Sequence, residues 1–181
     1  LMELNLSYND LTLLPELCGN WVSMESLDLA NNHLSELPNT CGKWTSLESL
    51  HLHCNKLRAC PLEMGSWNLL EKMDFHENKI NFVPKEIGHM VKLKELRLSH
   101  NEIFEFPDTV SLMTNLQILN MESNQLKGFP DTIKHVKTLR DLNLASNPHL
   151  KVVPFSLGKC GELRSLNLCS CGVSALPKEL A

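Results

Sequence analysis

The sequence has no long hydrophobic run and no block of like charge. Its apolar runs are at most four residues long, whereas a membrane-spanning helix needs about 20 apolar residues. The 17 lysines and arginines nearly balance the 21 aspartates and glutamates, which leaves a net charge of −4 without any basic cluster. These absences argue against a membrane span and against a nucleic-acid-binding surface. Residue 1 already belongs to the repeat described below, so we expect no signal peptide.

Cysteine is present, but not in a pattern typical of disulfides or of a metal site. The seven cysteines are an odd number, and no C-x-x-C pair occurs. Four of them fall where apolar residues are expected: Cys18, Cys41, Cys60 and Cys160. This usage is typical of a reduced, cytoplasmic protein rather than of a disulfide framework.

What the sequence does contain is one 23-residue unit, repeated along the whole chain. Its clearest copy is 93–107, with leucine at positions 1, 4 and 6, asparagine at 9 and an apolar–proline pair at 14 and 15. The repeats begin at residues 1, 24, 47, 70, 93, 116, 139 and 163. Cys171 replaces the asparagine in the eighth, after one inserted residue. The asparagines themselves are Asn9, Asn32, Asn55, Asn78, Asn101, Asn124 and Asn147. Such a period predicts a solenoid, so residues 1–181 are interpreted as a single array of eight repeats.

Each position of the unit predicts a local structure. Positions 4 and 6 alternate with polar residues, which indicates one short strand per repeat, and stacked repeats place these strands about 4.8 Å apart in a parallel sheet. Apolar residues spaced by three after the proline indicate a short helix with that proline in its first turn. The asparagine amide can donate and accept, so we expect it to satisfy backbone groups of the turn. Trp21, Trp44 and Trp67 share one position and are expected to fill the core.

The expected fold class is therefore α/β. The repeats should form a curved horseshoe with the parallel sheet on its concave face and short helices on its convex face. Neither the first nor the last repeat carries a polar capping segment, although repeat arrays need caps. We therefore expect the chain to be a fragment of a longer protein.

The unit L-x-x-L-x-L-x-x-N-x-L-x-x-L-P-x-x-I-G-x-L-x-x-L resembles the 23-residue class of cytoplasmic leucine-rich repeats. This class occurs in Ras-suppressor proteins, in Scribble and Erbin, and in the leucine-rich scaffold of the Ras–Raf pathway. Residues 147–155 and the Cys169-Ser170-Cys171 turn are similar to the last repeats of that scaffold. The resemblance implies a concave sheet that binds proteins without chemistry of its own, with small GTPases and phosphatase subunits among the partners of the class.

We therefore interpret the chain as a non-catalytic protein–protein interaction module of an intracellular scaffold or signalling protein. One alternative is a regulatory segment of a larger enzyme such as a Roco GTPase-kinase, and another is an architectural subunit of a large assembly. The sequence shows no Ser-His-Asp pattern, phosphate-binding loop or paired-carboxylate cleft, so neither enzymatic activity nor a cofactor is expected.

The candidate working surface follows from the strand pattern. If positions 4 and 6 point inward, the concave face presents positions 3, 5, 7 and 8, where charged residues and imidazoles concentrate on repeats three to five. A patch of mixed sign suits a protein partner of complementary charge. The candidate partner-binding residues are Asp28, His51, His53, Lys72, Asp74, His76, Glu77, Glu95, Arg97, His100 and Glu122.

The histidines in this patch raise the question of a metal. His53 and His76 should be neighbours, with His51 paired to Asp74, and two imidazoles with a carboxylate can hold zinc. Ligands on one strand face diverge, however, and no cysteine convincingly completes the set, so the sequence predicts no metal site. A pH-sensitive contact is favoured over a metal, because neighbouring imidazoles suppress each other's protonation.

Overall fold

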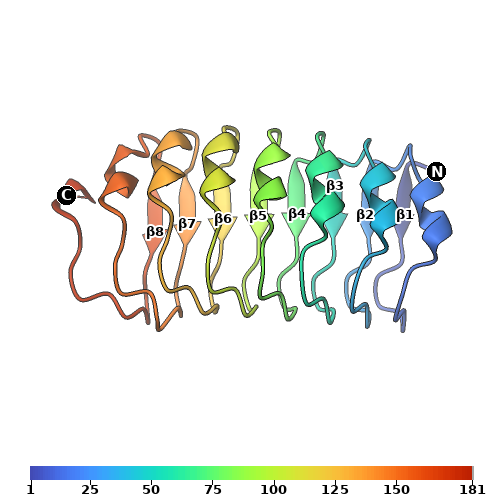
Figure 1. Ribbon diagram of the computed structural model, residues 1–181, viewed down its shortest axis with the longest axis horizontal. Helices are drawn as coiled ribbons and strands as arrows, with labels where there is room; N and C mark the ends of the chain where they lie inside the picture. Colours follow the sequence, from blue (N-terminus) through green and yellow to red (C-terminus); the bar gives the residue numbers. More distant parts are fainter. Residues whose placement is uncertain (181) are drawn as a thin grey trace.

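The computed structural model describes residues 1–180, which form a row of stacked repeats running from one terminus to the other (Figure 1). Each repeat contributes one three-residue strand, and all eight strands join a single parallel sheet in sequence order. The strands are β1 (Glu3–Asn5), β2 (Ser26–Asp28), β3 (Ser49–His51), β4 (Lys72–Asp74), β5 (Glu95–Arg97), β6 (Ile118–Asn120), β7 (Asp141–Asn143) and β8 (Ser165–Asn167). This architecture confirms the predicted eight-repeat solenoid.

The short helices lie on the other side of the array from the sheet (Figure 1). They are η1 (Glu16–Asn20), η2 (Asn39–Lys43), η3 (Leu62–Ser66), η4 (Lys85–His89), η5 (Asp108–Leu112), η6 (Asp131–His135), η7 (Phe155–Lys159) and η8 (Lys178–Leu180). All are 3₁₀ helices, whose three residues per turn match the apolar spacing of three in the sequence. Among the described residues, no helix is both long and apolar enough to cross a membrane.

The strands pair so that equivalent positions of neighbouring repeats stand side by side. Asp28 is paired with His51, His51 with Asp74, and Asp74 with Arg97. The 23-residue period therefore fixes the register, because a one-residue slip would turn every buried leucine outward.

The core lies between the sheet and the helices. Leu50 and Leu52, at positions 4 and 6 of the third repeat, are fully buried. Trp44 and Trp67 are fully buried as well, and their rings stack with centroids 6.1 Å apart. The indole N–H of Trp44 donates to the carbonyl oxygen of Cys18 at 2.9 Å. Trp44 and Trp67 thus belong to the core, as predicted, whereas Trp21 is only partly buried and packs against it.

The repeated asparagine satisfies backbone groups, as predicted, and it does so in two repeats at once. The Asn124 side-chain oxygen accepts the Ile103 N–H and its amide donates to the Leu98 carbonyl, both in the preceding repeat and both at 2.9 Å. The amide also donates to the Met121 carbonyl of its own repeat at 3.1 Å. Cys171, which stands in this place in the last repeat, offers one sulfur contact of 3.1 Å to the Leu144 carbonyl.

The prediction that the proline lies in the first helical turn is wrong by one residue. Pro84 is extended, with φ −72° and ψ 152°, and η4 begins only at Lys85. The Pro84 carbonyl oxygen accepts the Ile87 N–H at 3.1 Å, the i to i+3 bond of a 3₁₀ turn. The proline is therefore the N-cap of the helix: its backbone is still extended, and the next residue is the first helical one.

Position 8 of every repeat has a left-handed backbone, which the sequence did not predict because none of these residues is glycine. Their φ angles lie between 52° and 57°. The residues are Tyr8, Asn31, Cys54, Glu77, His100, Ser123, Ser146 and Ser170. Hydrogen bonds between repeats hold this conformation: the His100 N–H, for example, donates to the Glu122 carbonyl at 2.8 Å. Each strand is therefore followed by a sharp turn. The side chain at position 8 lies in this turn and does not follow the alternation of the strand.

Candidate functional site

The predicted partner-binding residues lie in the strands β2 to β5 or in the segments that directly follow β3 to β6. Burial alternates as expected: in β4, Met73 is buried, whereas Lys72 is exposed and Asp74 is half-buried. The strand members are Asp28, His51, Lys72, Asp74, Glu95 and Arg97. The members that follow a strand are His53, His76, Glu77, His100 and Glu122.

Five of the strand residues border one shallow hollow on the sheet. Its volume is about 240 Å³, and it is lined by Ser49, His51, Lys72, Met73, Asp74, Glu95 and Arg97. The Arg97 Nε donates to Glu95 Oε1 on the same strand at 2.6 Å. Small-molecule pockets usually measure about 300–1,000 Å³. The hollow is smaller and mostly polar, so it suits a single side chain of a partner better than an enclosed substrate.

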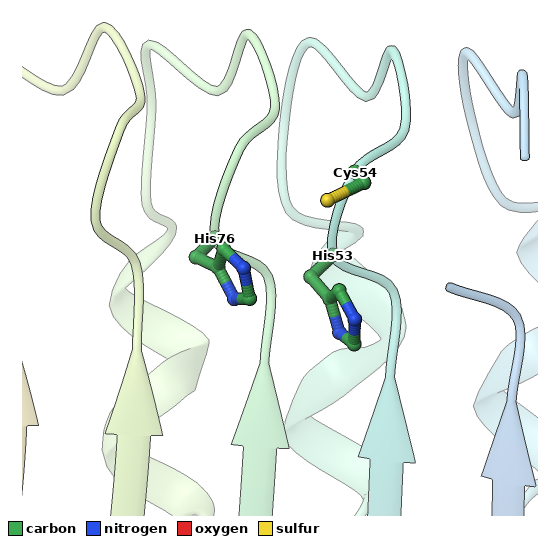
Figure 2. A group of neighbouring side chains, drawn as sticks. All are labelled: His53, Cys54 and His76. Carbon is green, nitrogen blue, oxygen red and sulfur yellow. The ribbon is translucent and has the colours of Figure 1, made fainter. Parts of the chain in front are cut away.

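Beside this hollow, His53 and His76 form a stacked pair at the ends of neighbouring strands (Figure 2). Their ring centroids are 4.5 Å apart and their planes differ by 7°. His76 Nδ1 lies 2.7 Å from Asp74 Oδ1, and His53 Nδ1 lies 3.8 Å from Asp74 Oδ2. One half-buried carboxylate thus faces both rings, and the predicted neighbourhood of His53, His76 and Asp74 is confirmed.

The Nδ1 atoms of His53 and His76 differ in their hydrogen bonding. The Nδ1 atom of His53 is buried without a hydrogen-bond partner. Burial lowers the pKa of His53, the neighbouring His76 lowers it further, and Asp74 opposes the change. His53 is therefore held neutral at neutral pH, whereas the 2.7 Å contact of His76 with Asp74 fixes a proton on His76 Nδ1, because the carboxylate can only accept.

Cys54 belongs to this cluster, although the sequence interpretation left it out. Its Sγ lies 3.4 Å from Glu77 Oε2, and donor atoms of His53, Cys54 and His76 lie within 4.8 Å of one another. Burial and the Glu77 carboxylate raise the pKa of the Cys54 thiol to about 11. The signal that could have revealed this residue is the pair of dipeptides His53-Cys54 and His76-Glu77, which stand 23 residues apart.

Three predicted residues lie outside both the hollow and the histidine cluster. The Asp28 Oδ1 accepts the Ala30 N–H at 2.9 Å and so closes its own turn. The Glu122 Oε2 accepts from the Asn143 side-chain amide at 2.9 Å, towards the C-terminal repeats. His100 is exposed at position 8 of the fifth repeat. Ionisable side chains are therefore concentrated on repeats three to five of this surface, with fewer charged groups on the repeats to either side.

Models of leucine-rich repeats match most of the chain. The model described as "Leucine rich repeat" matches residues 45–103, a two-copy repeat model matches 22–63, and a single-repeat model matches 1–21 and 115–136. No curated protein sequence gives a significant match.

Several solved structures share the fold over nearly the whole chain. A leucine-rich-repeat protein of Leptospira interrogans is 30% identical with a TM-score of 0.75, and the match covers 99% of this chain and 52% of that one. A TDR receptor is 29% identical with a TM-score of 0.85, over 93% of this chain and 30% of that one. The plant peptide hormone receptor RGFR1, in complex with RGF2, is 26% identical with a TM-score of 0.81, over 99% of this chain and 34% of that one. The chain thus spans about half of the first of these structures and a third of the others.

Proposed function

The chain belongs to the leucine-rich repeat family, and from this premise we propose that it is a non-catalytic module that binds a protein partner on the sheet face, with repeats three to five at the centre of the binding surface. One observation carries the proposal: ionisable side chains stand in register on an open sheet, from Asp28 through His51 and Asp74 to Arg97, with the helices on the opposite side. Solenoids use such extended concave surfaces for binding.

The balance of charge on this face indicates the chemistry of the partner. The cations Lys72 and Arg97 are outnumbered by carboxylates, and Arg97 is already engaged by Glu95. The carboxylates at positions 3, 5, 7 and 8 are Glu3, Asp28, Asp74, Glu77, Glu95, Glu122 and Asp141. Complementary potential steers association and fixes register. We therefore propose a partner that presents a basic surface.

The finer role that we propose is that of an intracellular scaffold or signalling protein in the cytoplasm. Its support is the cysteine usage, since Cys18, Cys41, Cys60 and Cys160 are buried as small apolar side chains in the core.

The resemblance to the cytoplasmic 23-residue class adds small GTPases and phosphatase subunits as candidate partners. Among the structures with the same fold, the RGFR1 complex with RGF2 supports binding of a polypeptide by this architecture. Cell fractionation of the tagged protein tests the location, and recovery in the secreted fraction would contradict it.

The experiment that tests the binding surface compares two charge-reversed variants with the unaltered chain. Partners are captured from lysate and identified, and the affinity of the purified partner is then measured for each form. The concave variant carries Glu95→Lys and Glu122→Lys. The control carries Glu36→Lys and Glu105→Lys, both exposed in the segments that lead from a strand to the next helix. The two variants have the same net charge.

The concave variant is expected to bind a basic partner at least tenfold more weakly, whereas the control should bind within about twofold of the unaltered chain. Both variants should keep the melting temperature of the unaltered chain, because all four substituted side chains lie outside the core. Equal weakening by both variants would show a mere effect of net charge and would refute the concave surface as the binding site.

A further inference from the structure

Two neighbouring repeats place metal-binding side chains at the same two positions. His53-Cys54 follows β3 and His76-Glu77 follows β4, so the first of these repeats supplies an imidazole and a thiol and the second an imidazole and a carboxylate. In Figure 2 the two rings lie side by side, and the Cys54 sulfur is directed to the side on which His76 lies. Donor atoms of His53, Cys54 and His76 lie within 4.8 Å of one another. Glu77 Oε2 lies 3.4 Å from the Cys54 sulfur, and its side chain would complete a set of four ligands.

The surroundings of the rings favour coordination. The proton on His76 Nδ1 is held by Asp74, which leaves a lone pair on the other ring nitrogen of His76. A carboxylate behind an imidazole is the usual arrangement for a metal-binding histidine, because it fixes the tautomer and raises the basicity of the ligand. His53 Nδ1, buried and without a hydrogen-bond partner, faces the second oxygen of the same carboxylate at 3.8 Å.

We propose that His53, Cys54, His76 and Glu77 bind one transition-metal dication, zinc being the expected ion, with Asp74 orienting the imidazoles. Imidazole, thiolate and carboxylate are the ligands of tetrahedral zinc sites, whereas magnesium and calcium prefer oxygen donors alone. The prediction of no metal from the sequence assumed that no cysteine completes the set. The structure removes that assumption by placing Cys54 beside both histidines.

Metal binding requires the ligand side chains to rearrange. Ring lone pairs lie in the ring plane, and the planes of His53 and His76 are nearly parallel, so at least one imidazole must turn about its χ2 angle to point at a shared ion. Zinc distances of about 2.0–2.3 Å place the ligands of a tetrahedron roughly 3.3–3.6 Å apart. The Cys54 sulfur and the Glu77 oxygen already have this separation, at 3.4 Å. Both histidine side chains are partly exposed, at 24% and 27%.

The proposal does not depend on the partner and is tested on the purified 181-residue chain. Zinc binding is measured by titration calorimetry of the reduced protein at neutral pH, and cobalt(II) is used as a spectroscopic substitute. We expect one equivalent of zinc to bind with a dissociation constant in the micromolar range or below. Cobalt should give a thiolate charge-transfer band and the visible bands of a tetrahedral ion. A tenfold excess of magnesium should not compete.

Matched variants locate the site. Cys54→Ser should abolish the thiolate band, whereas Cys169→Ser, which alters an exposed cysteine of the last repeat, should preserve it. His76→Ala should weaken zinc binding at least tenfold, and Asp74→Asn should weaken it by about 10–100-fold, as expected for a residue that acts through a ligand. A melting curve of each metal-free variant shows whether it is folded. The absence of saturable binding at one equivalent, or a thiolate band that survives Cys54→Ser, would overturn the proposal.

Discussion

The side-chain amide of Asn101 donates to the carbonyl oxygen of Phe75, one repeat earlier, at 3.0 Å. Its side-chain oxygen accepts the Ile80 N–H of that same earlier repeat at 2.9 Å. The same amide also donates to Leu98 and Ser99 within its own repeat. Asn101 therefore holds two repeats together by backbone groups that would otherwise be buried without partners.

Asn101→Ala should consequently lower the free energy of unfolding by about 1–3 kcal/mol, the cost of leaving buried polar groups unpaired. The control is Asn9→Ala, because Asn9 is exposed and its amide donates only to Leu6 and Ser7 of its own repeat. Denaturation in urea gives both values. Equal losses at the two positions would contradict the role assigned to the contacts between repeats.

Glycine and valine variants should rank in opposite order of stability at a left-handed position and in a strand. At Ser123, where φ is 54°, glycine should be more stable than valine by about 1–2 kcal/mol, because a branched side chain clashes in this conformation. At Ser26, in strand β2, valine should be the more stable of the two, because β-branched residues suit a strand. Midpoints of urea denaturation for the four variants test the inversion. The same order at both positions would refute it.

The close approach of neighbouring helices predicts an effect at Gly88. A Cβ atom there would lie 2.7 Å from the carbonyl oxygen of Thr109 in the next helix, so Gly88→Ala should lower the free energy of unfolding by about 1–3 kcal/mol. Gly161→Ala is the control, since a Cβ at Gly161 meets no atom within 4 Å. Thermal melting of both variants provides the measurement, and a Gly88 variant as stable as the control would show that the helices can separate without cost.

The cysteines should differ sharply in reactivity. Burial raises the pKa of Cys60 to about 12 and that of Cys41 to about 12, so both remain protonated thiols at pH 8 and are also shielded from reagents. Exposed Cys169 should react first with iodoacetamide, and Cys41 and Cys60 only after unfolding. Peptide mass spectrometry after a short alkylation distinguishes them. Modification of native Cys60 at the rate of Cys169 would contradict the buried assignment.

Much of the candidate site follows from the period alone. His51, Asp74 and Arg97 stand in register because they share position 5, and His53 neighbours His76 because they share position 7. Cys54 was missed although it shares position 8 with the predicted Glu77 and His100, because only charged residues and imidazoles were selected from the concave positions. The proposed metal ligands therefore include one residue that the sequence interpretation did not name, at the point where the regular strand ends.

The sequence by itself determined the number of repeats, the order and register of the strands and the inward positions, because a 23-residue period with leucines at fixed places allows only one way to bury them together. Only the tertiary structure decided the left-handed turns, the proline cap and the distances among His53, Cys54, His76 and Asp74. These depend on hydrogen bonds between repeats and on side-chain rotamers, both of which arise only when one repeat is stacked on the next.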